Sequence, residues 1–351
     1  MGKKRIFTSF VIAVVILSLL SIPGISFADL ITVTEEEPKY KYTTLPSEKA
    51  FIQRASSSDS LVTNATVGIT QGVDSNPLLD SSHAVDSYTQ EMVDMHYAYP
   101  LFTSILGFTK SKFGFNVINV NYYKKTDVNM FNSLIDYNIE MAASDKITVT
   151  SGYALEIMWF TNDEDGTYIG NEFNTSFKQF LTRWLYHKGT YRFRLKNFLS
   201  NKALDGYGIR ETKARQDTRN IFEHELGAYI GENTKVKIIN QFYLNNSNYS
   251  FTDFYDYSNY RTGGSVIQFF TNKLYGIAGF FYQRRNYKNR FTPRRQSRQK
   301  DNLYTVTSSL IYDIRRDTSI FLNYSHSENH SNEPFDQYVD TIYSAGLYYN
   351  F

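Results

Sequence analysis

Apolar and polar residues alternate at every second position through most of the chain from Leu61 onward, which is the period of a β-strand rather than a helix. The alternating runs between turn residues predict fourteen strands. Their predicted ranges are 61–72, 87–100, 112–124, 129–142, 146–160, 171–186, 189–199, 217–229, 234–245, 253–270, 273–285, 301–313, 318–326 and 337–351. Most exceed the roughly 5 or 6 residues typical of a soluble sheet. They match the roughly 9 to 11 residues with which a tilted strand crosses a bilayer.

The connections between the predicted strands alternate in length. Short turns are predicted at 144–145, 187–189, 231–233, 271–272 and 315–317, and long polar loops at 73–86, 161–170, 200–216, 286–300 and 327–336. Short turns at one end and long loops at the other are typical of bacterial outer-membrane barrels, whose chain ends lie on the short-turn side. Two segments depart from this pattern: 101–111 is long where a turn is expected, and 125–128 is short where a loop is expected.

The two faces of each predicted strand differ in polarity. In the strand 146–160, Leu155 and Trp159 share an apolar face, while Thr150 and Glu156 share the opposite one. A soluble sandwich would bury the apolar face against a second sheet, whereas a barrel in lipid turns it outward and keeps the polar face for the lumen. Together with the strand lengths and connections, this favours an all-β fold, a transmembrane antiparallel up-and-down β-barrel of about 14 strands.

The first 28 residues have the features of a secretory signal peptide. Residues 3–5 are basic, residues 7–20 are almost wholly apolar, and 26–28 place small residues where a signal peptidase reads them. We expect cleavage after Ala28, the alternative being an uncleaved anchor helix. The chain is then exported across the inner membrane.

Two further units follow the expected signal peptide. Residues 29–60 mix charged residues, Pro and Ser without periodicity, which predicts a periplasmic extension or linker. A short plug inside the pore is the alternative. Residues 61–351 form the predicted outer-membrane barrel.

Composition agrees with strands rather than helices as the membrane-crossing elements. The chain has 29 Tyr and 27 Phe but 2 Trp, and its mean hydropathy is −0.41. There is no Cys, which excludes disulfides, thiolate metal sites and a Cys nucleophile. The net charge of +2 is too small to favour a nucleic-acid partner.

The chain ends on an aromatic residue that completes an apolar stripe. Tyr343, Ala345, Leu347, Tyr349 and Phe351 occupy alternate positions and therefore share one face, which we expect to contact lipid. Such an ending looks like the signal by which the outer-membrane barrel-assembly machinery recognises its substrates. Tyr349 and Phe351 are the residues that we assign to it.

The last fifty residues also resemble the closing hairpins of known barrels. Arg298-x-x-Asp301, Asn323-Tyr324-x-x-x-x-Asn329 and the ending SAGLYYNF are similar to the barrel domain of surface lipoprotein assembly modulators and to putative outer-membrane porins of exopolysaccharide loci. The stretch 67–80, VGITQGVDSNPLLD, resembles the first hairpin of the same group. The resemblance implies a barrel with an export or assembly role. The modulators carry helical repeats before the barrel, where this sequence has about 32 residues.

Charged residues are predicted on the polar face of several strands, and hence in the pore. Arg192, Arg194 and Lys196 alternate with apolar residues, and neighbouring strands carry Glu223 and Glu225, then Lys235 and Lys237. Adjacent strands thus carry positive, negative and positive charge, which predicts either cross-strand ion pairs or a charged constriction that sets ion preference. An opposing acidic wall is expected from Asp136, Glu140 and Glu156.

A predicted loop near residue 290 is strongly basic and carries no acidic residue. Its cations are Arg284, Arg285, Lys288, Arg290, Arg294, Arg295, Arg298 and Lys300. On the outer surface they would bind lipopolysaccharide or an anionic glycan, because Arg forks onto phosphates and carboxylates. The alternative is a solvated loop neutralised by lipid phosphates.

Signals for catalysis or a cofactor are weak. The six His residues show no metal-site spacing, and SHSENHS at 325–331 offers Ser, His and Glu in a predicted loop without the geometry of a hydrolase. We therefore expect no enzymatic activity, no cofactor and no metal. The leading hypothesis is an outer-membrane channel for small solutes or the exit of a glycan. The alternatives are an assembly or translocation helper for surface proteins, a surface-binding barrel and a rim hydrolase.

Overall fold

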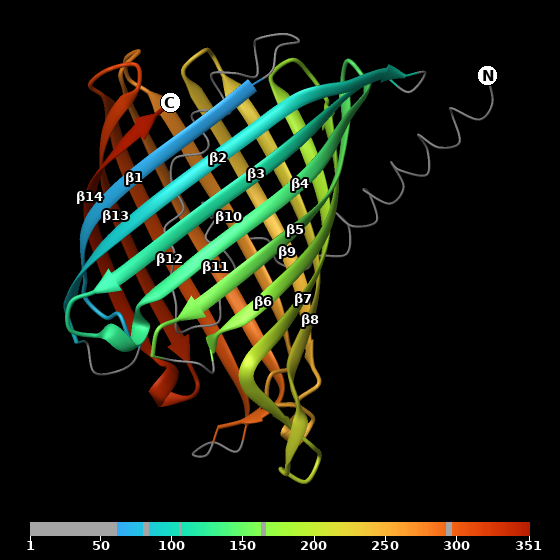
Figure 1. The fold of residues 1–351 in the computed structure, drawn as a ribbon, viewed down its shortest axis with the longest axis vertical. Coiled ribbons are helices and arrows are strands. Elements are labelled where there is room, and N and C mark those ends of the chain that lie inside the picture. The colour runs from blue at the N-terminus through green and yellow to red at the C-terminus, as the bar shows by residue number, and fades with distance from the viewer. Residues whose placement is uncertain (1–61, 80–83, 105–106, 163–165, 293–296) are drawn as a thin grey trace.

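A computed structural model describes residues 62–79, 84–104, 107–162, 166–292 and 297–351 (Figure 1). The expected signal peptide, its cleavage site and the segment 29–60 lie outside these residues. Within the described part of the chain, no helix is long and apolar enough to cross a membrane.

Fourteen antiparallel strands close into one barrel, in which every strand pairs with its neighbours in sequence and β1 pairs with β14 (Figure 1). The strands are β1 (Val62–Asp74), β2 (Asp86–Ser104), β3 (Gly107–Tyr122), β4 (Met130–Ser144), β5 (Ile147–Phe160), β6 (Tyr168–Phe180), β7 (Leu185–Leu204), β8 (Arg210–Ile230), β9 (Thr234–Ser247), β10 (Tyr257–Phe269), β11 (Leu274–Phe291), β12 (Arg298–Asp313), β13 (Thr318–Ser331) and β14 (Tyr338–Asn350). The predicted fold class and the predicted number of strands are confirmed, although the strand predicted over 171–186 spans the end of β6, a turn and the start of β7.

The seam between β1 and β14 completes the ring. The pairing runs in register from Thr66 opposite Asn350 to Asp74 opposite Ile342. The Thr66 hydroxyl donates to Asn350 Oδ1 at 2.7 Å, and the Phe351 amide donates to the Ala65 carbonyl at 2.8 Å. The seam therefore leaves no open edge between the first and the last strand.

The outer face of this barrel is apolar, so its surroundings are lipid. Ile69, Phe173 and Leu322 expose 50%, 57% and 60% of their surface on it. Phe351 at the chain end exposes 72%, as the terminal stripe predicts. A closed barrel with an apolar exterior spans the bacterial outer membrane, because closure satisfies every strand edge in hydrocarbon. A soluble sandwich is excluded, since no second sheet covers the apolar face in the described structure.

The tight connections lie at the end of the barrel where β1 begins and β14 ends. Between the predicted strands, 101–111 is a long connection where a turn is expected; in the structure a tight turn is indeed present, because β2 and β3 extend until Ser104 pairs with Gly107. The predicted turn at 187–189 is wrong, since these residues lie in β7 and the turn occupies 181–184. That turn contains no Gly or Pro; instead the Thr182 hydroxyl accepts the Leu185 amide at 3.0 Å.

The opposite end carries long hairpins rather than long loops. Predicted loops at 200–216, 286–300 and 327–336 are largely strand, because β7 continues to Leu204, β11 to Phe291 and β13 to Ser331. The hairpin of β7 and β8 projects furthest beyond the barrel (Figure 1). Both faces of a strand are in water beyond the membrane, so polar residues occupy both and the alternation that predicts a strand disappears.

Several inward-facing glycines lie beneath aromatic rings. The ring of Tyr348 covers Gly68 across the seam, and the rings of Tyr88 and Tyr186 cover Gly72 and Gly227 on neighbouring strands. A side chain at these positions would occupy the space of the ring. The glycines therefore let large aromatic residues lie flat against the inner wall.

The exposed aromatic end predicts a role for Phe351 in barrel assembly. Deleting Phe351 or replacing it by Asp should lower the amount of folded barrel several-fold while export across the inner membrane continues. The heat-modifiable band on a gel measures the folded fraction. Phe335→Asp is the control, because Phe335 is equally exposed at 73% but lies in the connection to β14. An unchanged band after deletion of Phe351 would contradict the assignment.

The close approach at Gly346 gives a second test. A Cβ at Gly346 would overlap the Ile69 carbonyl oxygen and the ring of Phe321, which stacks on Tyr348 at 4.2 Å. We expect Gly346→Val to destabilise the barrel by about 1 to 3 kcal/mol, the usual cost of overpacking. The control, Ala345→Val, places the same side chain on the lipid side of the neighbouring position. Equal thermal stability of the two variants would show that the close contacts of Gly346 do not limit the stability of the barrel.

Candidate functional site

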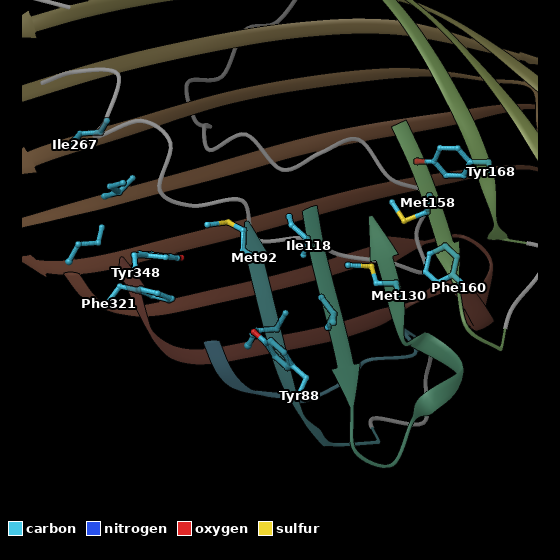
Figure 2. Packing of buried hydrophobic residues seen from close by; sticks show 14 of the residues in the cluster. Tyr88, Met92, Ile118, Met130, Met158, Phe160, Tyr168, Ile267, Phe321 and Tyr348 are labelled. Carbon is cyan, nitrogen blue, oxygen red and sulfur yellow. The ribbon is translucent and has the colours of Figure 1, made fainter. Parts of the chain in front are cut away.

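The lumen is the candidate functional site, and part of its wall is apolar. Met92, Ile118, Met130 and Met158 are buried on the inner face of β2 to β5 (Figure 2). They belong to a buried cluster that continues to Phe321 and Tyr348 on the closing strands. The inner face, which the alternation predicts to be the polar one, is therefore polar only in part. Rings and thioethers fill the space above the glycine positions and between polar side chains.

Cations gather on the inner face of five consecutive strands, β7 to β11, which we call the basic wall. Its members are Lys188, Arg192, Arg194, Lys196, Arg215, Arg219, Lys235, Lys237, Arg261 and Arg285. Carboxylates on the same strands are fewer, namely Glu211, Asp217, Glu223 and Glu225. The predicted alternation of positive, negative and positive strands is therefore present, with positive charge in excess.

Cross-strand ion pairs hold two of the predicted pore arginines. Arg192 Nη2 lies 2.7 Å from Glu223 Oε2, as predicted, and Gln241 donates to the same carboxylate at 3.0 Å. Arg194 instead pairs with Glu172 on the other side, in β6, at 2.7 Å. Arg194 lies opposite Arg219 in β8, so repulsion there favours the pairing with β6.

The other charged residues predicted to line this region are Lys196, Glu225, Lys235 and Lys237. Lys196 is buried and its Nζ lies 4.0 Å from the centre of the Tyr168 ring, a cation–π contact. Glu225 accepts a hydrogen bond from the Tyr186 hydroxyl at 2.6 Å. Lys235 and Lys237 both lie in β9, and Lys237 is buried.

The predicted acidic residues line the lumen but do not form an opposing wall. Glu140 pairs with Lys112 at 2.6 Å, and Asp136 accepts from Asn138 at 2.6 Å. Glu156 accepts from Asn132 at 3.2 Å and interacts electrostatically with Arg194. These acids lie on β4 and β5, and only β6 separates these two strands from β7. The acids are therefore close to the basic wall rather than opposite it.

Sequence reasoning missed the most buried part of the basic wall. Arg215, 2% exposed, bonds Asp217 on its own strand through Nε at 3.0 Å, and its guanidinium lies over the Tyr255 ring. Arg219, 1% exposed, donates to Asn245 at 2.6 Å. Their outward neighbours Gln216, Thr218 and Asn220 are polar, so β8 shows too little alternation here to indicate a lumen position.

A buried aromatic cluster adjoins these arginines. Tyr243, Tyr257 and Tyr287 pack with Ile221 across β8 to β11. Arg285 lies 4.7 Å from the Tyr257 ring centre and donates to the Tyr287 hydroxyl at 3.2 Å. Its neighbour Asn259 is fully buried, and neither polar atom of its side chain has a hydrogen-bond partner within the described part of the chain.

The predicted basic loop near residue 290 is not a loop. Arg284, Arg285, Lys288 and Arg290 lie in β11, and Arg298 and Lys300 in β12. Arg294 and Arg295 lie outside the described residues. Arg285 points into the lumen, and Arg290 pairs with Asp336 at 3.1 Å. Because strand residues alternate between faces, the run divides into inward and outward cations.

The histidine segment SHSENHS is strand, not the expected loop. Ser325 and Ser327 are buried on the inner face of β13, whereas His326 and His330 alternate with them on the outer face. His326 Nδ1 lies 2.9 Å from the Thr341 hydroxyl and His330 lies 3.0 Å from Glu328. The structure therefore does not bring these Ser and His side chains together.

Comparison with known proteins identifies similar folds but no family. No protein-family model and no curated protein matches the chain. Among solved structures, OmpT of Vibrio cholerae is similar at 10% identity and a TM-score of 0.48, over 84% of this chain and 99% of that one. A bacterial polysaccharide outer membrane secretin has 8% identity, a TM-score of 0.45 and coverage of 82% and 98%. An anion-selective porin from Comamonas acidovorans has 9% identity, a TM-score of 0.44 and coverage of 83% and 99%.

The expectation that the chain is not an enzyme requires correction. It rested on the poor hydrolase signal of one segment, whereas the solved structures that the chain resembles include several forms of OmpT as well as porins. A barrel of this architecture does not exclude catalysis, since chemistry depends on a local site rather than on the fold. Absence of enzymatic activity is therefore not a conclusion about this protein.

The ion pair between Arg192 and Glu223 should contribute to barrel stability. We expect Arg192→Gln or Glu223→Gln to lower the free energy of unfolding by about 1 to 3 kcal/mol, because each leaves a half-buried charge without its partner. Urea-induced unfolding in lipid vesicles measures this loss. Arg183→Gln, in the exposed turn before β7, is the matched control. The double variant should lose less than the sum of the single losses; full additivity would contradict the pairing.

Proposed function

We propose that this barrel is an outer-membrane channel whose basic wall favours anionic solutes. The observation that carries the proposal is the excess of cations over carboxylates on the inner face of β7 to β11. Charges that line a pore impose an electrostatic filter on the ions that enter it. A local excess of positive charge raises the concentration of anions at the wall and opposes cations.

The ion pairs limit how selective this filter is. Arg192 and Arg194 form ion pairs with Glu223 and Glu172. The paired charges largely cancel, so they act weakly on solutes. Lys112 and Glu140 on the far side of β6 form a neutral pair as well. We therefore infer a moderate preference for anions rather than exclusion of cations.

We further propose that carbohydrate is the solute class, so that the barrel serves as the exit of an anionic glycan. The supporting observation is that the Asn259 amide, which has no hydrogen-bond partner among the described residues, lies beside Arg285 and the buried rings of Tyr257 and Tyr287. A cation and an unpaired amide held together on one wall suit sugars that carry carboxylates. The alternative, a helper for surface proteins, predicts no dependence on glycan and no conductance.

Ion selectivity in a planar bilayer tests the channel. Lys235→Gln combined with Lys237→Gln should move the reversal potential in a salt gradient toward cation preference, because two positive charges leave the wall. The shift should stop short of full cation selectivity, since the arginines remain. Lys273→Gln, in the exposed turn before β11, is the control and should leave the potential unchanged. A purified barrel that never conducts would exclude the channel and favour a helper or surface-binding role.

A further inference from the structure

The outer face of the barrel carries a groove that the channel does not use. It crosses β12, β13, β14 and β1 and has a volume of about 780 Å³. Small side chains, Ser308 and Ala345, lie at its floor, between Leu310 and Leu322 on one side and Tyr343 on the other. Its outward lining residues include Leu310, Leu322 and Tyr343, which are exposed on the lipid-facing side, and its lining surface is mostly apolar, so the groove suits hydrocarbon.

Polar groups border the groove where it reaches β1. Gln71 donates to the Thr89 hydroxyl at 2.7 Å, the Tyr123 hydroxyl lies 2.7 Å from the same oxygen, and Tyr123 donates to Gln71 at 3.0 Å. All three side chains lie at the outer surface. They form hydrogen bonds to one another near the loop end of the strands. This is the level at which the headgroup of a lipid joins its acyl chains.

Cations lie beyond the groove toward the loop end of the same strands. Lys300 is in β12, eight residues from Ser308, which is roughly 26 Å along a strand. Arg284 and Lys288 accompany it in β11, and Arg298 follows in β12. The rings of Tyr282 and Tyr304 lie 5.1 Å apart between the cations and the groove. Outward Tyr residues of this kind occupy the membrane interface.

Three of these four cations have no carboxylate partner in the described structure. Lys288 pairs with Asp253 at 3.1 Å and Asp256 at 3.3 Å. Arg284, Arg298 and Lys300 are exposed, and no ion pair to any of them occurs among the described residues. The outward cations thus differ from the lumen arginines Arg192 and Arg194, whose charges are balanced within the protein.

We propose that this face binds a phosphorylated glycolipid of the outer leaflet. Arg284, Arg298 and Lys300 bind its phosphate groups, and an acyl chain lies in the groove over Ser308 and Ala345. Phosphate at the level of the cations and hydrocarbon at the level of the groove match the order of these groups in such a lipid. A second copy of the barrel is a poorer occupant, because two copies meeting on this face would bring like charges together.

Binding of bisphosphorylated lipid A to the purified full-length protein, measured by native mass spectrometry, tests the phosphate contacts. We expect Arg284→Gln combined with Lys300→Gln to weaken binding roughly 25-fold, about fivefold for each charge removed. The control, Lys273→Gln combined with Arg316→Gln, removes two charges from the short turns and should leave binding unchanged. Monophosphorylated lipid A should bind the native protein more weakly than the bisphosphorylated form. Equal binding by both double variants would overturn the proposal.

The groove has its own test. Ser308→Phe fills its floor and should lower lipid A affinity several-fold, whereas Val306→Phe on the same strand and face lies outside the lining and should not. The heat-modifiable gel shift confirms that each variant is folded. Binding of inorganic phosphate as strong as that of lipid A would overturn the role of the groove. A stable dimer cross-linked through position 345 would show that a second copy occupies this face instead.

Discussion

Every backbone amide and carbonyl inside a bilayer must find its hydrogen-bond partner within the protein, because hydrocarbon offers none. A sheet meets this requirement only when its first and last strands pair. In this chain that pairing joins Thr66 to Asn350 and continues to Asp74 and Ile342. The even number of strands follows from this antiparallel closure, as does the position of the start of β1 and the end of β14 on one side of the membrane.

Closure also determines what the inner wall must accommodate. Because side chains alternate between the two faces, half of the residues of every strand point inward. The lumen therefore contains charged, polar and aromatic side chains that lie close together. Arg192 and Arg194 are balanced by glutamates on opposite neighbouring strands, while Lys196 rests on the Tyr168 ring. The glycines beneath Tyr88, Tyr186 and Tyr348 make room for the rings. The proposed preference for anions rests on the excess of cations over carboxylates on this wall.

The same alternation separates two kinds of positive charge that are contiguous in sequence. Arg284 faces outward and Arg285 inward, although they are adjacent. The inward residue contacts Tyr257 and Tyr287 in the lumen, and the outward one borders the membrane surface. In the two roles proposed above, one basic stretch serves the pore on one face and a lipid headgroup on the other. The two cations face opposite sides because β11 continues as a strand beyond the membrane, where side chains still alternate between its faces.

The barrel was predictable from the amino-acid pattern alone, because lipid on one side and a lumen on the other require residues such as Leu155 and Trp159 to recur at every second position. It also placed Arg192, Glu223 and Lys237 on the inner face, since parity follows from that period. Tertiary structure decided the pairings: Arg194 contacts Glu172 rather than a residue of β8 because the register sets Arg219 opposite it. It likewise decided where strands end. Beyond the membrane both faces of a strand meet water, so stretches such as 200–204 and 286–291 carry no periodic signal, and only hydrogen bonding to a neighbouring strand makes them part of the sheet.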